Sequence, residues 1–457
     1  MAYSASNFDV VVVGLGYVGL PLAVALSKQF VTVGLDINRQ RVDELNAGFD
    51  RTNEIDSHQL KCANLKVTAD PKQCPIADFY IVTVPTPVDN HNRPDLSILE
   101  AATATVASMV KRASSAGRVP IIVFESTVYP GVTEDVCAPI IERESGLVCG
   151  SDFFLGYSPE RINPGDREHT IDKITKVISG QTPEVSEKIA LLYGRITTGG
   201  VFRAASIRAA EAAKVIENAQ RDINIAFMNE VTQIFQKCDL SVWDVLDAAK
   251  TKWNFLPFSP GLVGGHCIGV DPYYLAYRAE QMGYDPRVIL AGRSINDGMA
   301  EWVAGQLHDL RSRPGRVLVL GLTFKENVPD LRNSKVADLI AGLVARGHEV
   351  VVHDPLADPE EALHEYSLVL DPQALDHQYD LVVLAVSHAE YLDMGPEHLR
   401  KRLNANGVLA DHLGHDTAQG LDAQGQRGHV QQQHVGAVTR EHLALDGGAH
   451  GHGFVGV

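Results

Sequence analysis

A loop around Cys267 combines side-chain types that could carry covalent catalysis. Gly264-Gly265-His266-Cys267 lies in an aromatic-rich stretch, residues 253–275, and Asp271 follows shortly after the cysteine. A thiolate can attack an electrophilic carbon, and a nearby carboxylate can move the protons of the same reaction. The two glycines are expected to let a ligand approach the backbone beside the thiol. The loop therefore predicts a nucleophilic site; a buried, inert cysteine is the alternative.

A long helix upstream carries two polar side chains that could serve the same reaction. Residues 206–236 contain neither Gly nor Pro and are rich in Ala, Glu, Lys and Ile, which predicts one continuous helix. Lys214 and Asn218 are spaced i, i+4, so both project from one face and could donate to the same oxygen. An exposed polar face is the alternative for this pair. Apolar residues on more than one face predict that the helix is buried between domains or subunits.

A glycine-rich turn follows the first apolar strand of the chain. Asp9–Val13 form a β-branched run, and Gly14-Leu15-Gly16-Tyr17-Val18-Gly19 leads directly into an apolar helix. Such glycines allow a tight turn, close approach of a pyrophosphate and close packing of helix on strand. A second strand, residues 31–35, ends at Asp36, whose carboxylate could bind a ribose and repel a 2′-phosphate. The pattern predicts NAD rather than NADP, with Arg41 flanking the adenosine; an unoccupied turn is the alternative.

Further strands alternate with helices after this turn. Residues 79–84 and 120–124 are apolar and flank a helical pattern over residues 96–112, which predicts a doubly wound parallel sheet. Ligands of such sheets bind beyond the carboxyl ends of the strands, so hydroxyl side chains there are candidate cofactor contacts. The threonines at these strand ends are Thr83, Thr86 and Thr127.

A second strand–helix–strand rhythm begins after Pro314-Gly315. A buried strand starts at Arg316, and further strands are expected over residues 349–353 and 379–386, without a G-x-G-x-x-G turn. Its first turn, Gly321–Asn327, is followed by Asp330-Leu331-Arg332 and offers cations in place of glycines. Cations at a strand-end turn fit a nucleotide diphosphate.

These patterns predict an α/β protein: two Rossmann-like, doubly wound parallel-sheet domains joined by a central helical domain with one long helix. The expected boundaries are 1–200 for the NAD-binding domain, 201–312 for the central helical domain with the cysteine loop, 313–411 for a second domain that binds a nucleotide diphosphate and 412–457 for an atypical tail.

Composition excludes several classes of partner. Forty Lys and Arg against 57 Asp and Glu give a formal charge of −17, which repels nucleic acid and anionic membranes. No basic leader and no apolar run of spanning length is present, so the cytoplasm is the expected compartment. The six cysteines form no C-x-x-C pair and His266 has no second ligand at metal spacing, so neither disulfides nor a metal are expected.

Ordered motifs over roughly residues 8–411 resemble those of the UDP-glucose/GDP-mannose dehydrogenase superfamily. They are Gly14-Leu15-Gly16-Tyr17-Val18-Gly19, Glu125-Ser126-Thr127, Tyr157-Ser158-Pro159-Glu160-Arg161, Glu211 to Asn218, Gly264 to Cys267, and Phe324-Lys325 through Arg332. The segment Gly265–Tyr274 resembles the UDP-N-acetylhexosamine 6-dehydrogenases, including the Vi-antigen type, more than the UDP-glucose enzymes, which carry Lys where this chain has Val270.

The resemblance implies oxidation of a C6 alcohol to a carboxylate by two hydride transfers to NAD. Cys267 would form a thiohemiacetal and then a thioester, and Lys214 and Asn218 would stabilise the oxyanion. Asp271, with Thr127 and Lys214 holding a water, would be the general base.

The resemblance also places substrate and cofactor contacts outside these groups. Glu160 and Arg161 would belong to the substrate loop, with Glu160 also near the chemistry, and Lys325 would lie near the sugar and diphosphate. Arg332 would lie near NAD. Further substrate contacts are expected from Phe255, Gly264 and, across a dimer interface, Lys252.

Several alternatives stay open at this point. The motifs do not distinguish UDP-GlcNAc from its C4 epimer UDP-GalNAc. UDP-ManNAc and UDP-glucose are alternative substrates. A hydroxyacid dehydrogenase would share the first domain but would need no thiol, and an inactive nucleotide-binding relic is a third class. The expected assembly is a homodimer or higher homo-oligomer, and the expected pathway is surface polysaccharide synthesis.

The C-terminal tail departs from the family pattern after Asp411. Residues 412–457 are rich in His and Gly, contain a run of glutamines and show neither helical nor strand periodicity. We expect that a reading-frame shift replaced the native ending and that the tail is poorly ordered. A His-rich metal-binding tail is the alternative, although the His spacing is irregular.

Overall fold

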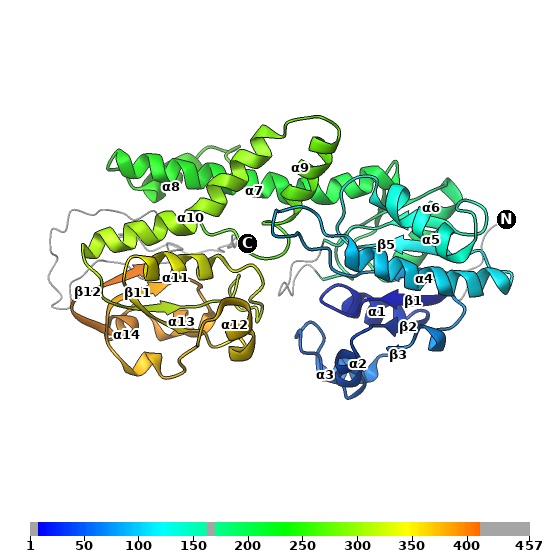
Figure 1. The fold of residues 1–457 in the computed structure, drawn as a ribbon, viewed down its shortest axis with the longest axis horizontal. Helices are drawn as coiled ribbons and strands as arrows, with labels where there is room; N and C mark the ends of the chain where they lie inside the picture. The colour runs from blue at the N-terminus through cyan, green and yellow to red at the C-terminus, as the bar shows by residue number, and fades with distance from the viewer. Residues whose placement is uncertain (1–7, 162–169, 412–457) are drawn as a thin grey trace. The chain divides into compact units, whose positions relative to one another are not determined.

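The computed structural model describes residues 8–161 and 170–411, so the predictions for the tail lie outside the described residues. The chain divides into two compact units (Figure 1). The first unit comprises Met1–Asn218 and Val270–Asp285, and the second comprises Ala219–Gly269 and Pro286–Val457. The long helix α7, Ile207–Lys237, begins in the first unit and ends in the second.

The first unit alternates strands and helices around one sheet. Its strands are β1 Asp9–Val13, β2 Val31–Leu35, β3 Leu65–Thr68, β4 Phe79–Val82, β5 Ile121–Phe124, β6 Phe154–Tyr157, β7 Lys176–Gly180 and β8 Val201–Arg203. Its helices are α1 Gly19–Ser27, α2 Arg39–Asn46, α3 Ser57–Cys62, η1 Pro71–Gln73, α4 Ser97–Ser115, η2 Thr133–Cys137, α5 Ala138–Ser145, α6 Pro183–Tyr193 and α9 Asp271–Gln281.

The sheet of the first unit has the order β3-β2-β1-β4-β5-β6-β7-β8. Neighbouring strands run parallel, as expected, except that β7 pairs antiparallel with β6. The predicted doubly wound sheet is therefore parallel at every pairing except this one. The reversal places the first residue of β7 at the edge where β5 and β6 end.

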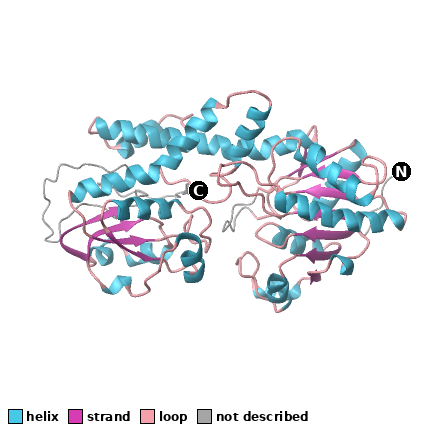
Figure 2. Cartoon of the chain, viewed as in Figure 1, coloured by secondary structure: helices cyan, strands magenta, loops and turns pink. Residues whose placement is uncertain are grey.

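The second unit contains a smaller parallel sheet and the remaining helices. Its strands are β9 Arg316–Leu320, β10 Glu349–His353, β11 Tyr379–Leu384 and β12 Leu403–Asp411, in the order β10-β9-β11-β12. Its helices are α8 Val242–Lys250, α10 Arg287–Arg311, α11 Lys335–Ala345, α12 Pro359–Tyr366, η3 Ala374–Asp376, α13 Ala389–Met394 and α14 Pro396–Arg400. Figure 2 shows helices flanking the strands in both units.

Both sheets are buried on their two faces. Val11 and Val13 pack in one core cluster of the first unit, whereas their neighbours Val10 and Val12 pack in another. The second sheet divides its strand residues between two clusters in the same way. Strands covered on both faces need continuous apolar runs, which explains the sequence pattern. The predicted class, two Rossmann-like folds with a central helical region, is confirmed.

Within the described residues, no helix is long and apolar enough to cross a membrane.

Candidate active site

A buried cluster on α7 and α9 contains three of the predicted catalytic residues. Asn218 Nδ2 donates to Asp271 Oδ2 at 2.5 Å, and Lys214 Nζ lies 3.7 Å from the same oxygen. Asp271 is the first residue of α9, so its carboxylate belongs to the first turn, at the positive end of the helix dipole. Burial raises the pKa of Asp271, and the charge of Lys214 and the bond from Asn218 oppose that rise only in part. Such a carboxylate is suited to accept a proton near neutral pH.

Helix α7 also binds the backbone of the loop that follows Thr127. Glu211 accepts hydrogen bonds from Gly131 N at 2.6 Å and Thr133 N at 2.9 Å. Burial raises the pKa of Glu211 to about 7. Thr86 Oγ1 donates to Thr127 O at 2.6 Å, and the Thr127 side chain is half-buried. Glu211 therefore positions this loop, a role that the sequence pattern did not indicate.

A second buried network joins the ends of three strands of the first unit. Lys176 Nζ lies 2.7 Å from Glu125 Oε2 and 3.3 Å from Glu160 Oε2, and the Tyr193 hydroxyl donates to Glu125. The Lys176 side chain is 1% exposed. Burial alone would lower the pKa of Lys176, but the two carboxylates hold it above its usual value. Sequence analysis missed Lys176, whose only signal was a charge at the start of an apolar strand.

Both carboxylate oxygens of Glu160, the candidate substrate residue, therefore have a partner. Its Oε1 accepts the Arg161 N–H at 2.6 Å while Oε2 faces Lys176. Arg161 is exposed and pairs with Glu217 of α7 at 2.9 Å. Their contact with substrate remains a prediction.

The glycine turn fits a pyrophosphate. Gly14 has φ +93°, and a Cβ on Gly19 would lie 1.8 Å from Gly14 O, so neither position tolerates a side chain. A Cβ on Gly16 would meet nothing within 4 Å, which leaves that part of the turn open to a ligand. Asp36 Oδ2 accepts from Leu15 N at 2.8 Å and is half-buried beside the turn. The residues present therefore fit NAD.

Two other predicted cofactor residues support this turn from inside the protein. Thr83 Oγ1 donates to Gly14 O at 2.7 Å. Arg41 is buried, donates from Nε to Leu15 O at 3.0 Å and pairs with Asp50 at 2.7 Å. The structure thus gives Arg41 and Thr83 supporting roles, and direct contact with the cofactor stays a prediction for both.

Cys267 and the two glycines before it belong to the second unit, and Cys267 is half-buried. A Cβ on Gly264 would lie 2.7 Å from Asn333 O, and one on Gly265 would lie 2.7 Å from the Phe324 ring. The glycines are thus required for packing within this unit, a reason different from the predicted approach of a ligand. Burial raises the thiol pKa of Cys74 to about 11 and of Cys137 to about 12, so those thiols are poor nucleophiles at neutral pH.

The other predicted groups of this unit lie on loops. His266 Nδ1 is 3.8 Å from Asp330 Oδ2, and Arg332 binds the same carboxylate at 2.6 Å. Lys252 is exposed, whereas Phe255 and Lys325 are partly buried. Their placement on substrate, and that of Arg332 on NAD, remain predictions. Among the described residues, no three His, Cys, Asp or Glu side chains gather as metal ligands.

Three sequence models of one family match consecutive parts of the chain. The NAD-binding domain of the UDP-glucose/GDP-mannose dehydrogenase family matches residues 8–197, its central domain matches 208–298, and its UDP-binding domain matches 318–414. The cofactor is therefore NAD and the substrate class is a UDP-sugar.

Named relatives span nearly the same length. The UDP-N-acetyl-D-glucosamine 6-dehydrogenase of Pseudomonas aeruginosa is 50% identical over 412 residues, covering 89% of this chain and 96% of the relative. The enzyme of that name from Salmonella typhi is 45% identical over 416 residues, covering 90% and 96%. The solved UDP-D-ManNAc dehydrogenase of Pyrococcus horikoshii aligns with a TM-score of 0.78 at 28% identity, covering 88% and 95%.

Proposed function

Because the chain belongs to the UDP-glucose/GDP-mannose dehydrogenase family, we propose that it oxidises C6 of UDP-N-acetyl-D-glucosamine to the carboxylate. The buried cluster of Lys214, Asn218 and Asp271 carries this proposal, because it combines a proton acceptor with two donors. The names of the 50% and 45% identical relatives favour the gluco configuration over its C4 epimer. The product is an activated uronic acid, whose consumer would be a glycosyl transfer in surface polysaccharide synthesis.

In the first oxidation the cluster handles the proton. Asp271 accepts the proton of the C6 hydroxyl, and Lys214 and Asn218 donate to the oxygen as it gains negative charge. Bound at the glycine turn beside Asp36, NAD would supply the hydride acceptor for both oxidations. The first step leaves an aldehyde.

In the second oxidation Cys267 bonds to C6, so the hydride leaves from a thiohemiacetal instead of a free aldehyde. Its thiolate adds to the aldehyde to form a thiohemiacetal, and loss of the second hydride leaves a thioester. Asp271 then removes a proton from the water that hydrolyses the thioester and frees the thiol. The balance is one alcohol and one water converted to one carboxylate, with two hydrides transferred and three protons released.

Product stoichiometry tests this function. UDP-GlcNAc with excess NAD should yield two NADH and one carboxylate per sugar, and UDP-glucose and UDP-ManNAc should react more slowly. One NADH per substrate would instead indicate a simple alcohol dehydrogenase, and none with any UDP-sugar would indicate a nucleotide-binding protein without activity.

Lys214→Ala should lower kcat by about a hundredfold to a thousandfold, the usual effect of losing one oxyanion donor. Because the Lys214 charge lowers the pKa of Asp271, its removal should also move the acidic limb of the pH–rate profile to higher pH. Lys237→Ala, an exposed lysine at the end of the same helix, is the control. A raised KM for the sugar nucleotide with an unchanged kcat would instead mark Lys214 as a ground-state ligand only. Asn218→Ala should be milder.

Asp36→Ala should weaken the binding of NAD by about tenfold, because a hydrogen-bond acceptor for the ribose is lost. It should also raise the relative use of NADP, because the repulsion of a 2′-phosphate disappears. Since Asp36 also accepts from Leu15 N, Asp36→Asn is the companion variant: its amide oxygen can keep that bond while the charge is lost. Kinetics with both cofactors measure the ratio. An unchanged ratio in both variants would remove Asp36 from the cofactor site.

The exposed face of α7 fits a homodimer. Ile216, Phe227 and Ile234 lie on one side of this helix and are 53%, 56% and 49% exposed. Apolar side chains repeated at helical spacing normally face a partner. Phe227→Glu should therefore halve the mass measured by light scattering, whereas Val344→Glu, at an equally exposed site on α11, should not. A monomeric parent protein would exclude this assembly.

A further inference from the structure

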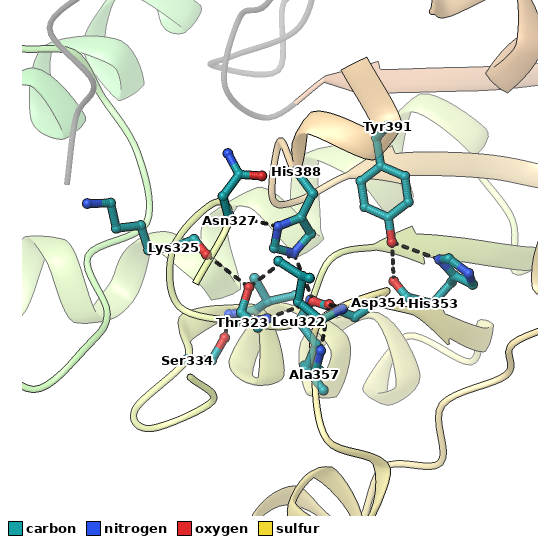
Figure 3. A network of polar contacts seen from close by, with 12 residues as sticks. Leu322, Thr323, Lys325, Asn327, Ser334, His353, Asp354, Ala357, His388 and Tyr391 are labelled. Atoms are coloured by element: carbon teal, nitrogen blue, oxygen red, sulfur yellow. Dashed lines mark hydrogen bonds and ion pairs between the residues drawn. The ribbon is translucent and has the colours of Figure 1, made fainter. Parts of the chain in front are cut away.

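A buried histidine–aspartate pair in the second unit has no part in the proposed chemistry. His388 follows β11 and Asp354 follows β10, and their side chains are 1% and 0% exposed. His388 Nε2 lies 3.1 Å from Asp354 Oδ2 and 3.1 Å from Thr323 Oγ1 (Figure 3). A fully buried polar pair is costly unless each member is hydrogen-bonded, so its partners indicate what it does.

The hydrogen bonds of His388 fix its tautomer. Asn327 N donates to His388 Nδ1 at 2.9 Å, so Nδ1 must be the acceptor and carries no proton. The ring proton of the neutral form therefore sits on Nε2 and points to Asp354. Asn327 is bound a second time, because Ala389 N donates to its Oδ1 at 2.8 Å.

Asp354 binds the start of the same segment. Its Oδ2 accepts from Leu322 N at 2.6 Å and Thr323 N at 3.0 Å, and its Oδ1 accepts from Leu356 N and Ala357 N. Burial alone would raise the pKa of Asp354, but His388 and the backbone donors hold it well below its usual range. The carboxylate therefore remains ionised at working pH.

Together the two side chains accept hydrogen bonds from both ends of one turn, Gly321–Asn327. We call it the lysine turn because it contains Lys325. Its first residue has φ +92° and its last has φ +59°, conformations that Gly and Asn tolerate. Inside it, Thr323 Oγ1 donates to Lys325 O at 3.0 Å. Figure 3 shows the Lys325 side chain extending away from the buried pair.

The first unit has a glycine turn with the same backbone hydrogen bonds, but the environment of its aspartate differs. Gly14 N donates to Leu35 O and Gly321 N to His353 O, both at 2.8 Å, and each glycine has φ near +92°. Asp36 and Asp354 each accept from the residue after that glycine. Asp36 remains half-buried, whereas Asp354 is enclosed by His388 and by the residues that follow it. Asp354 therefore cannot receive a ribose as Asp36 can.

We propose that His388 and Asp354 are positioning residues that hold the lysine turn in the shape that places Lys325 on the diphosphate of the nucleotide sugar. The inference rests on the proposed function, because it assumes that Lys325 binds substrate. Neither residue touches substrate, so removing one should affect binding of the UDP part and spare the hydride-transfer steps.

Three single variants test this. His388→Leu should raise the KM for UDP-GlcNAc and the Kd for UDP by about tenfold, the effect of losing a buried hydrogen-bond pair, with kcat and the KM for NAD within about twofold. His388→Asn should recover part of the loss, because its Oδ1 can still accept from Asn327 N. Tyr379→Phe is the control: its hydroxyl is also buried in the second unit, but it donates to Ala374 O at 2.8 Å, near the start of β11 and away from the turn.

A double-mutant cycle with Lys325→Ala makes the test specific. If His388 acts through Lys325, His388→Asn should cost almost nothing in UDP affinity once Lys325 is absent. Fully additive losses, an unchanged Kd for UDP in both His388 variants, or an equal loss in Tyr379→Phe would overturn the proposal. If wild-type protein fails to bind UDP, the proposed function itself fails, which separates the two outcomes. His388→Asn keeps the test valid should His388→Leu not fold.

Discussion

Replacing Cys267 with serine lowers steady-state formation of the carboxylate by at least about a thousandfold, equivalent to ~4 kcal/mol in the barrier. A serine hydroxyl is almost wholly protonated at neutral pH, so it cannot add to the aldehyde as a thiolate does. Product analysis by mass spectrometry and counting of NADH per sugar measure the effect. The stoichiometry should fall from two to one, with aldehyde accumulating, or to zero.

Cys238→Ser is the matched control, because Cys238 is exposed and belongs to the same unit as Cys267. It should retain full activity and two NADH per sugar. Full acid production by the Cys267→Ser variant would remove the thioester from the mechanism. Loss of the first hydride step as well would leave the mechanism standing, because the serine can also disturb the packing of the loop.

Local periodicity was sufficient to predict the parts of the site that lie on one helix. The i, i+4 spacing of Lys214 and Asn218 predicted a shared face, and both side chains do reach one oxygen of Asp271. Continuous apolar runs predicted strands covered on both faces, as the alternating core clusters show. Such features depend only on neighbours along the chain, so a sequence pattern can indicate them.

Features that depend on how distant elements meet could not be predicted in this way. The glycines before Cys267 predict room for a ligand beside the backbone, which stays a prediction; the structure adds that a Cβ on either would meet Asn333 or Phe324, far along the chain. Asp354 follows its strand as Asp36 does, but His388 from the end of another strand and the backbone of Ala357 enclose its carboxylate. Both outcomes follow from tertiary contacts that leave no periodic signal.

The direction of β7 is the clearest such case. In a parallel sheet, Lys176, the first residue of its strand, would lie at the edge opposite to Glu125 and Glu160, which follow β5 and β6. Because β7 runs antiparallel to β6, Lys176 instead lies with both carboxylates. The reversed strand thus makes Lys176 the buried counter-ion of the candidate substrate residue Glu160.

Lys176→Met should consequently be among the most destabilising substitutions in the first unit, costing about 3–5 kcal/mol. Methionine fills similar space but leaves two buried carboxylates facing each other without a cation, and burial already raises the pKa of Glu125. The shift in denaturant midpoint measures the loss, and Glu125→Gln in the same chain should restore part of it by removing one charge. Arg203→Met, which breaks the exposed Arg203–Glu187 pair on neighbouring β8, should cost at most about 1 kcal/mol.

Equal midpoint shifts for the buried and exposed pairs would contradict the view that Lys176 neutralises Glu125 and Glu160. Where Lys176→Met does fold, released Glu160 should raise the KM for UDP-GlcNAc, whereas Arg203→Met should leave it unchanged.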